Sequence, residues 1–184
     1  MAAGRCSDAM QQLTIEQFES MLADAPIKPR FKRELKFRQS TPHMNELAWA
    51  ETELLAIWNK SKTGGIVLAQ PGNELFMIPF DASKHTADKT GRSKPVICDL
   101  CYTWQPSSGG GFVTFYPDKT GSNSVSLLCC LDLRCSEHVR TKTAAGLTSR
   151  TQLREHMTNE ARAERLRQRL QTFIVRLSNQ PVHY

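Results

Sequence analysis

The sequence lacks any long hydrophobic run. Nowhere in its 184 residues is there a stretch near the roughly 18 consecutive apolar residues that a membrane-spanning helix needs. The start of the chain, residues 1–12, is polar and of mixed charge, so it also lacks the apolar segment of a secretory signal peptide. We therefore expect a cytoplasmic protein that has no membrane partner.

The motifs of several enzyme classes are absent as well. The run Gly109–Gly111 is not followed by the lysine and helix of a phosphate-binding loop. Zinc deaminases need a His-x-Glu element ahead of Pro-Cys-x-x-Cys, but His85 is followed by Thr-Ala, and two residues separate Pro95 from Cys98. No motif assembles a Ser-His-Asp triad. We therefore expect no enzymatic activity and no small-molecule substrate.

The charge of the chain is concentrated at one end. The overall composition, 40% apolar and 23% charged, is that of an ordinary folded protein. Residues 1–138 hold 15 basic and 15 acidic side chains, whereas residues 139–184 hold nine basic and three acidic ones, which accounts for the net charge of +6. This basic segment predicts an acidic partner, either nucleic acid or an acidic protein surface.

Helices are predicted near both ends of the chain. Thr14 is the N-cap of a helix over residues 15–23, in a capping-box pattern. Apolar residues at three- and four-residue steps predict a second helix over residues 43–59, and a short third helix lies between the two, within 27–38. One long helix is expected over residues 151–177.

Strands are predicted in the middle of the chain. Residues 66–69 and 75–80 are apolar runs on either side of a Pro-Gly-Asn turn, and they predict a hairpin. Residues 112–116 and 125–130 predict a second hairpin. The fold class is therefore α+β, with N-terminal helices, a small antiparallel sheet and a long C-terminal helix. The expected division of the chain is a helical region (1–62), a β-rich domain (63–148) and a basic helix (149–184).

The predicted C-terminal helix carries a row of arginines opposite its apolar face. They follow one another at steps of three, four and seven residues, namely Arg162, Arg165, Arg169 and Arg176. We expect the apolar face to pack against the rest of the protein and these guanidinium groups to be displayed for partner binding. A solvated helix face is the commoner meaning of such a row.

The six cysteines indicate metal ligands or buried apolar residues, because thiols stay reduced in the cytoplasm. Residues 98–101 read Cys-Asp-Leu-Cys, a knuckle whose tight turn lets two thiolates converge on one ion. The second pair must come from Cys129, Cys130, Cys135 or His138, and the spacing alone does not decide among them. Four such ligands predict one structural zinc, with a hairpin between the two pairs as in a treble clef.

Two segments resemble the elongation factor G-binding proteins of the FusB type. In that family the motif runs I-C-D-L-C and then C-x-D-L-x-C-S-x-x-V-R, which residues 97–101 and 130–140 match in order and spacing. The resemblance implies a treble-clef zinc finger with one zinc, and it implies that His138 is not a ligand. The four ligands that it implies are Cys98, Cys101, Cys130 and Cys135.

The same resemblance implies a function. It points to a non-enzymatic protein that binds elongation factor G at the ribosome and modulates translation, which in this family is linked to release of stalled factor. Fusidic acid protection is known for members with a longer N-terminal helical bundle, whereas this chain has only about sixty residues before its first predicted strand.

The alternative from the residues themselves is a zinc-stabilised module that binds RNA or the ribosome independently of the factor. The basic run within 28–38 and the arginine row would contact phosphates, and aromatic residues such as Trp104 and Tyr116 would stack on bases.

Overall fold

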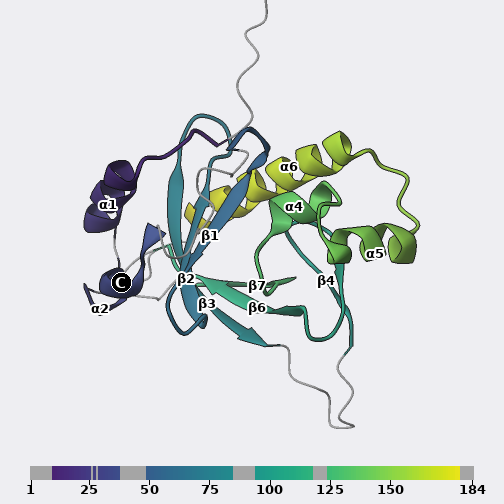
Figure 1. Cartoon of the computed structure of the whole chain (residues 1–184), viewed down its shortest axis with the longest axis horizontal. Helices are drawn as coiled ribbons and strands as arrows, with labels where there is room; N and C mark the ends of the chain where they lie inside the picture. Colours follow the sequence, from purple (N-terminus) through teal and green to yellow (C-terminus); the bar gives the residue numbers. More distant parts are fainter. Residues whose placement is uncertain are drawn as a thin grey trace, which may run out of the picture.

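A five-stranded antiparallel sheet forms the centre of the protein in a computed structural model that describes residues 10–25, 27, 29–37, 49–84, 94–117 and 124–178 (Figure 1). Its strands lie in the order β1 (Leu54–Trp58), β2 (Gly64–Ala69), β3 (Phe76–Lys84), β6 (Gly110–Phe115) and β7 (Val125–Cys130). A second, two-stranded sheet pairs β4 (Val96–Ile97) with β5 (Trp104–Gln105). The predicted α+β class is confirmed.

Helices cover both faces of the large sheet (Figure 1). They are α1 (Ile15–Asp24) and α2 (Pro29–Glu34) on one side, and α4 (Cys135–Val139) and α6 (Asn159–Ser178) on the other. Helix α5 (Ala144–Leu153) packs against α4 and the small sheet. Strand β2 is buried along its whole length. Since successive strand residues point to opposite faces, Ile66 and Leu68 join the core beneath α1, and Val67 and Ala69 join the core beneath α6.

The first helix begins where the sequence predicts. The Gln17 N–H donates to Thr14 Oγ1 (3.2 Å), and the Thr14 N–H donates to Gln17 Oε1 (2.9 Å), which completes the capping box. Phe18 and Leu22 are buried one turn apart, and the Phe18 ring stacks on Phe37 with centroids 4.6 Å apart. A short helix within 27–38 is confirmed as well, as α2.

The helix predicted over residues 43–59 is wrong in its described part. Residues 49–51 form one 3₁₀ turn, and residues 54–58 form β1, which pairs along its length with β2. Five consecutive apolar residues suit a strand covered on both faces, and Leu54 and Ile57 indeed face opposite cores. Gly65 lets the two strands approach, because a Cβ there would lie 2.1 Å from the Ile57 carbonyl oxygen. Residues 43–48 lie outside the described residues.

Both predicted hairpins are present, as β2–β3 and β6–β7. Strand β3 joins them, since its first half pairs with β2 and its second half, from Phe80 onward, pairs with β6. The sheet therefore begins at Leu54, within the part of the chain that the sequence assigned to the helical region, and it ends at Cys130, a predicted metal ligand.

The predicted long C-terminal helix is present as α6, but its predicted start at residue 151 is wrong, because residues 151–153 belong to the separate helix α5. Arg154 adopts a left-handed conformation (φ 49°) that ends α5, and the Ala161 N–H donates to Thr158 Oγ1 (3.2 Å) at the start of α6. In the core, the rings of Phe115 and Phe173 meet edge to face at 4.8 Å. No helix in the described part of the chain, α6 included, combines the length and apolar character needed to cross a membrane.

Candidate metal centre

The small β4–β5 sheet positions the first pair of cysteines. Cys98 follows β4, its N–H donates to the Thr103 carbonyl (3.0 Å), and its carbonyl accepts from the Tyr102 N–H (2.9 Å). Tyr102 has a positive φ of 61°, which closes the turn. The Cys101 N–H points at Cys98 Sγ (3.5 Å), the arrangement of a zinc knuckle.

The second pair lies where β7 passes into α4. Cys130 is the last residue of β7 and Cys135 the first of α4. Between them the chain turns at Leu133, which has a φ of 50° and donates its N–H to the Cys130 carbonyl (3.1 Å). The hairpin β6–β7 therefore leads from the first ligand pair to the second, and a helix follows, as the treble-clef prediction requires.

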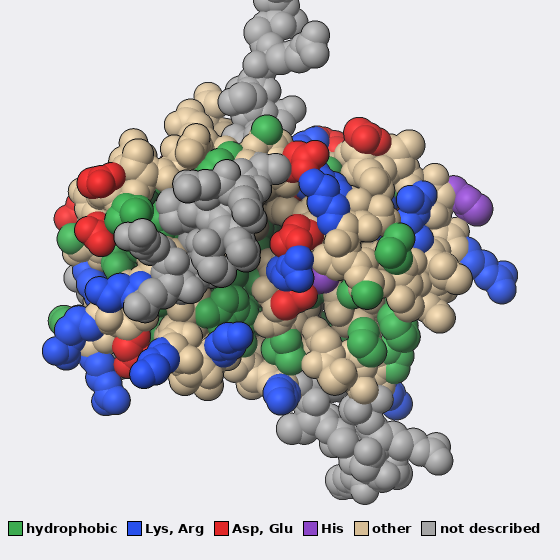
Figure 2. Space-filling view, viewed as in Figure 1, with side chains coloured by type: hydrophobic (Ala, Val, Ile, Leu, Met, Phe, Trp, Pro, Cys, Tyr) green, Lys and Arg blue, Asp and Glu red, His purple; other side chains and the backbone are tan. Residues whose placement is uncertain are grey.

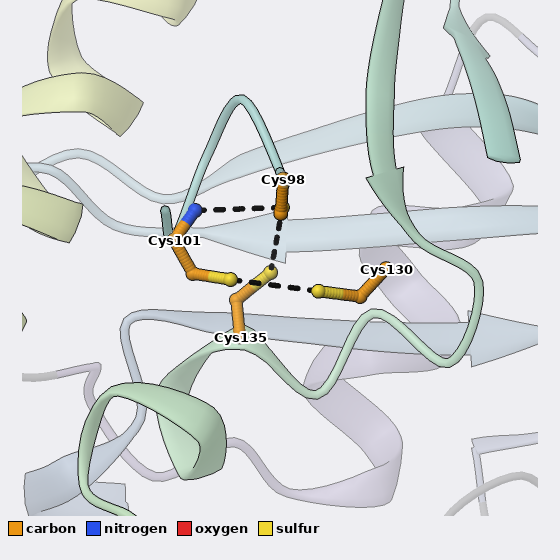
Figure 3. Close-up of side chains that lie close together, drawn as sticks. All are labelled: Cys98, Cys101, Cys130 and Cys135. Atoms are coloured by element: carbon orange, nitrogen blue, oxygen red, sulfur yellow. Dashed lines mark hydrogen bonds between the residues drawn. The ribbon is translucent and has the colours of Figure 1, made fainter. Parts of the chain in front are cut away.

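The four sulfurs point toward one another (Figure 3). The Sγ atoms of Cys98 and Cys135 are 4.0 Å apart, those of Cys101 and Cys130 are 3.5 Å apart, and all four lie within 4.8 Å of one another. A tetrahedral zinc with Zn–S bonds of about 2.3 Å requires sulfurs about 3.8 Å apart. These residues, all free thiols and all buried, therefore fit one structural zinc.

The mutual effect of the four thiols on their ionisation also favours a bound cation. Burial would raise the pKa of the Cys98 thiol, but hydrogen bonds from the neighbouring thiols lower that pKa well below its usual value. The same contacts act in reverse on two of the neighbours: hydrogen bonds with Cys101 raise the pKa of Cys130 and of Cys135 well above their usual values. Without a metal the charge of one thiolate opposes ionisation of the others, and a divalent ion removes that opposition.

The structure places Cys130, and not Cys129, in the group of four. The two are successive strand residues, so their side chains leave β7 on opposite sides. Cys130 Sγ also accepts a hydrogen bond from Gln105 Nε2 (3.1 Å), a group of the kind that orients metal ligands. Cys129 is buried too, and the proximity of the Cys98 thiol is the main cause that raises its pKa.

His138, the remaining candidate ligand, is buried. Its Nε2 lies 3.0 Å from Asp132 Oδ1 and its Nδ1 lies 2.6 Å from Thr143 Oγ1. Cys130, Asp132 and His138 do bring ligand atoms within 4.8 Å of one another. Both imidazole nitrogens are nevertheless engaged, so the ring ties the Cys130–Cys135 loop to the start of α5, in agreement with the implied absence of His138 from the ligands.

Polar residues of the motif next to the cysteines hold the centre in place. The Asp99 N–H donates to the Leu128 carbonyl (2.7 Å), and Asp99 Oδ2 accepts from the Leu128 N–H (2.8 Å), so the knuckle is fixed to β7. Ser136 Oγ accepts from the N–H groups of Glu53 (2.9 Å) and Leu54 (3.2 Å), which fixes α4 to the start of β1. The sequence motif contains these polar residues, but it does not tell what they contact.

The arginine row of α6 faces the knuckle. Arg169 Nη1 donates to the Asp99 carbonyl (2.9 Å), and the guanidinium carbons of Arg165 and Arg169 lie 4.9 and 4.6 Å from the centre of the Tyr102 ring. Arg162 is fully buried, so the prediction that it is displayed for a partner is wrong. Arg176 is exposed, as expected. The sequence spacing correctly placed these arginines on one face of the helix, but it could not show that this face packs against the zinc knuckle.

Comparison with known families decides the classification. A sequence model of the FBP C-terminal treble-clef zinc-finger family matches residues 30–177. The chain belongs to this family. The match to the FBP C-terminal family extends from α2 through α6, and so it includes the whole sheet and all four clustered cysteines. Among curated proteins and among solved structures, none matches the chain significantly.

Proposed function

We propose that this protein binds elongation factor G at the ribosome, without enzymatic activity of its own, and thereby modulates translation. The observation that carries the proposal is membership of the FBP C-terminal family over residues 30–177, together with the FusB-type motif around both cysteine pairs. The contacts of Asp99 and Ser136 support it, because they give the motif residues that match the family a role in building this domain.

In this proposal the zinc has a structural role. Its four thiolate ligands come from the knuckle, the end of β7 and the start of α4, so one ion joins three segments. A closed shell of four thiolates leaves no coordination position for water or substrate, which supports a non-enzymatic role with no small-molecule substrate. Thiolate ligands also need a reducing compartment, and we place the protein in the cytoplasm for that reason.

An exposed basic surface lies on α2, on the side of the sheet away from the zinc. Figure 2 shows Lys and Arg side chains gathered over this helix. The exposed members are Arg30 and Arg33 on the helix and Lys36 two residues after its end, and the side chain of Arg30 is 88% exposed. An acidic face of the partner would be attracted to this surface. We therefore propose α2 as the first surface to test, and Arg176 at the far end of α6 as the second.

The test is a pull-down of the host's own elongation factor G with the full chain. We expect binding at low micromolar concentration, and its absence would contradict the proposed partner. The variant R30E/R33E/K36E should weaken binding if α2 is the contact surface, and R176E should do so if the end of α6 is. Binding that survives both variants would exclude both surfaces. Arg162, Arg165 and Arg169 are unsuitable for charge reversal, because they contact the zinc knuckle or are buried.

The α2 surface also supports a second candidate, an RNA- or ribosome-binding module independent of the factor. Binding to phosphates weakens steeply with salt, so an RNA complex that uses several of these cations should lose roughly tenfold or more in affinity over a modest rise in salt. Retention of the protein on ribosomes stripped of elongation factor G, with this salt dependence, would favour the RNA candidate over the first.

A further inference from the structure

Arg162 is a buried cation that its hydrogen bonds do not account for. Its side chain projects from α6 and is fully buried, and none of its three guanidinium nitrogens has a hydrogen-bond partner among the described residues. Taking a guanidinium out of water is costly unless negative charge nearby compensates it. A compensating group must therefore lie in its surroundings.

Glu155 compensates only part of this charge. Its Oε2 lies 3.1 Å from Arg162 Nε, but its Oε1 lies 2.6 Å from Nη1 of Arg165, so two guanidinium groups share one carboxylate. Burial is the main cause that lowers the pKa of Arg162, and the nearby charge of Arg150 adds to it. The neighbours that oppose this shift are the Glu155 carboxylate first and then Cys101.

The contacts of α6 place the face that carries Arg162 beside the zinc knuckle. Arg162, Arg165 and Arg169 are spaced three and four residues apart, so they lie on one face of the helix. The later two contact the knuckle directly, through the Tyr102 ring and the Asp99 carbonyl. The face that carries Arg162 therefore runs along the turn that holds Cys98 and Cys101.

A zinc ion bound by four thiolates carries a net charge of about −2. Such a dianion in a buried site needs positive groups around it, as any buried charge does. We infer that Arg162 supplies counter-charge to the tetrathiolate zinc centre, and that this is why an arginine without full hydrogen bonding is kept in the core. The inference rests on the zinc site alone, so it does not depend on the proposed partner.

The experiment measures zinc affinity of the full chain by competition with a chromogenic chelator. Arg162→Met removes the charge and keeps an apolar stem, and it should weaken zinc binding about 10–100-fold, the range typical for the outer partners of metal ligands. Arg162→Lys keeps a positive charge and should recover most of the affinity. Arg176→Met is the matched control on the same helix, and it should bind zinc as the parent protein does.

A loss of zinc affinity can also arise from a weaker fold, because metal binding and folding are coupled. Leu22→Ala serves as a control for this, since Leu22 packs in the core on the other face of the sheet, away from the zinc. At an equal loss of stability in urea, Arg162→Met should lose more zinc affinity than Leu22→Ala. Equal losses would overturn the inference.

Glu155→Gln gives a test of opposite sign. This substitution removes a negative charge that repels the zinc centre and competes with it for Arg162. Zinc binding should therefore become a few-fold tighter at equal stability. If Arg162 and Glu155 were only a structural ion pair, breaking it would weaken the fold and the zinc affinity together. Zinc binding in Glu155→Gln that is no tighter than in Leu22→Ala at an equal loss of stability would therefore overturn the inference.

Discussion

Glu53, just ahead of β1, and Arg140, just after α4, form a two-pronged ion pair. Arg140 Nη1 donates to Glu53 Oε2 (2.8 Å) and Arg140 Nη2 donates to Oε1 (2.5 Å). The Glu53 side chain is buried, and Arg167 on α6 adds a third contact at 3.3 Å. One carboxylate thus joins the first strand of the sheet to both helices that border the zinc centre.

Removing this carboxylate should be strongly destabilising. Glu53→Ala leaves the half-buried Arg140 and Arg167 without their shared partner, and the loss expected for breaking a buried pair is about 3–5 kcal/mol. Urea unfolding of the zinc-loaded protein measures it. The double variant Glu53→Leu with Arg140→Met removes both charges and should recover part of the loss. A change in Glu53→Ala below about 1 kcal/mol would show that the pair contributes as little as a surface ion pair.

Local patterns predicted the zinc centre well because its information is local. The knuckle at 98–101 and the Cys130–Cys135 segment each supply two ligands within a few residues, so their spacing alone indicates a shared ion. What the spacing left open, Cys129 or Cys130, depends on which side of β7 faces the knuckle. That is a tertiary relationship, and only the family resemblance pointed to it before the structure did.

The errors in the predicted secondary structure also have tertiary causes. Residues 54–58 are apolar throughout, and such a run has no single period, so both a buried strand and a helix accommodate it. Pairing with β2 decides between them. The break at residues 154–158 contains neither proline nor glycine. It forms where Arg154 adopts a left-handed conformation and Thr158 caps α6. The Glu155 carboxylate, within this break, forms ion pairs with Arg162 and Arg165.

The choice of Cys130 over Cys129 can be tested with two neighbouring substitutions. Cys129→Ser should retain one zinc per chain, because its sulfur lies outside the group of four. Cys130→Ser removes a thiolate from that group and should lose the zinc or bind it far more weakly. Elemental analysis of the purified proteins gives the ratio of metal to protein. Loss of zinc in Cys129→Ser with retention in Cys130→Ser would reverse the assignment.

Removing the metal should loosen one side of the sheet more than the other. The four thiols lose the ion that joins the knuckle, the end of β7 and α4, and structural zinc contributes directly to folding. After chelation, amide hydrogen exchange should rise in residues 96–105 and 130–139 well before it rises in α1, whose core lies on the opposite face. The melting temperature should fall at the same time. Unchanged exchange and melting after verified zinc removal would contradict a structural role.

The packing of α6 against the sheet determines whether this helix is part of the domain or a separate basic appendage. Phe173 packs against Phe115 in the core of the sheet, whereas Val175, two residues later on the same helix, is 52% exposed. Phe173→Ala should cost about 3–5 kcal/mol, because it opens a cavity in a packed core. Val175→Ala should change stability by no more than about 0.5 kcal/mol. Denaturant unfolding of the two variants provides the comparison. Similar small effects would mean that α6 only rests on the sheet, whereas a large difference in a single cooperative transition would make the helix integral to the fold that holds the zinc.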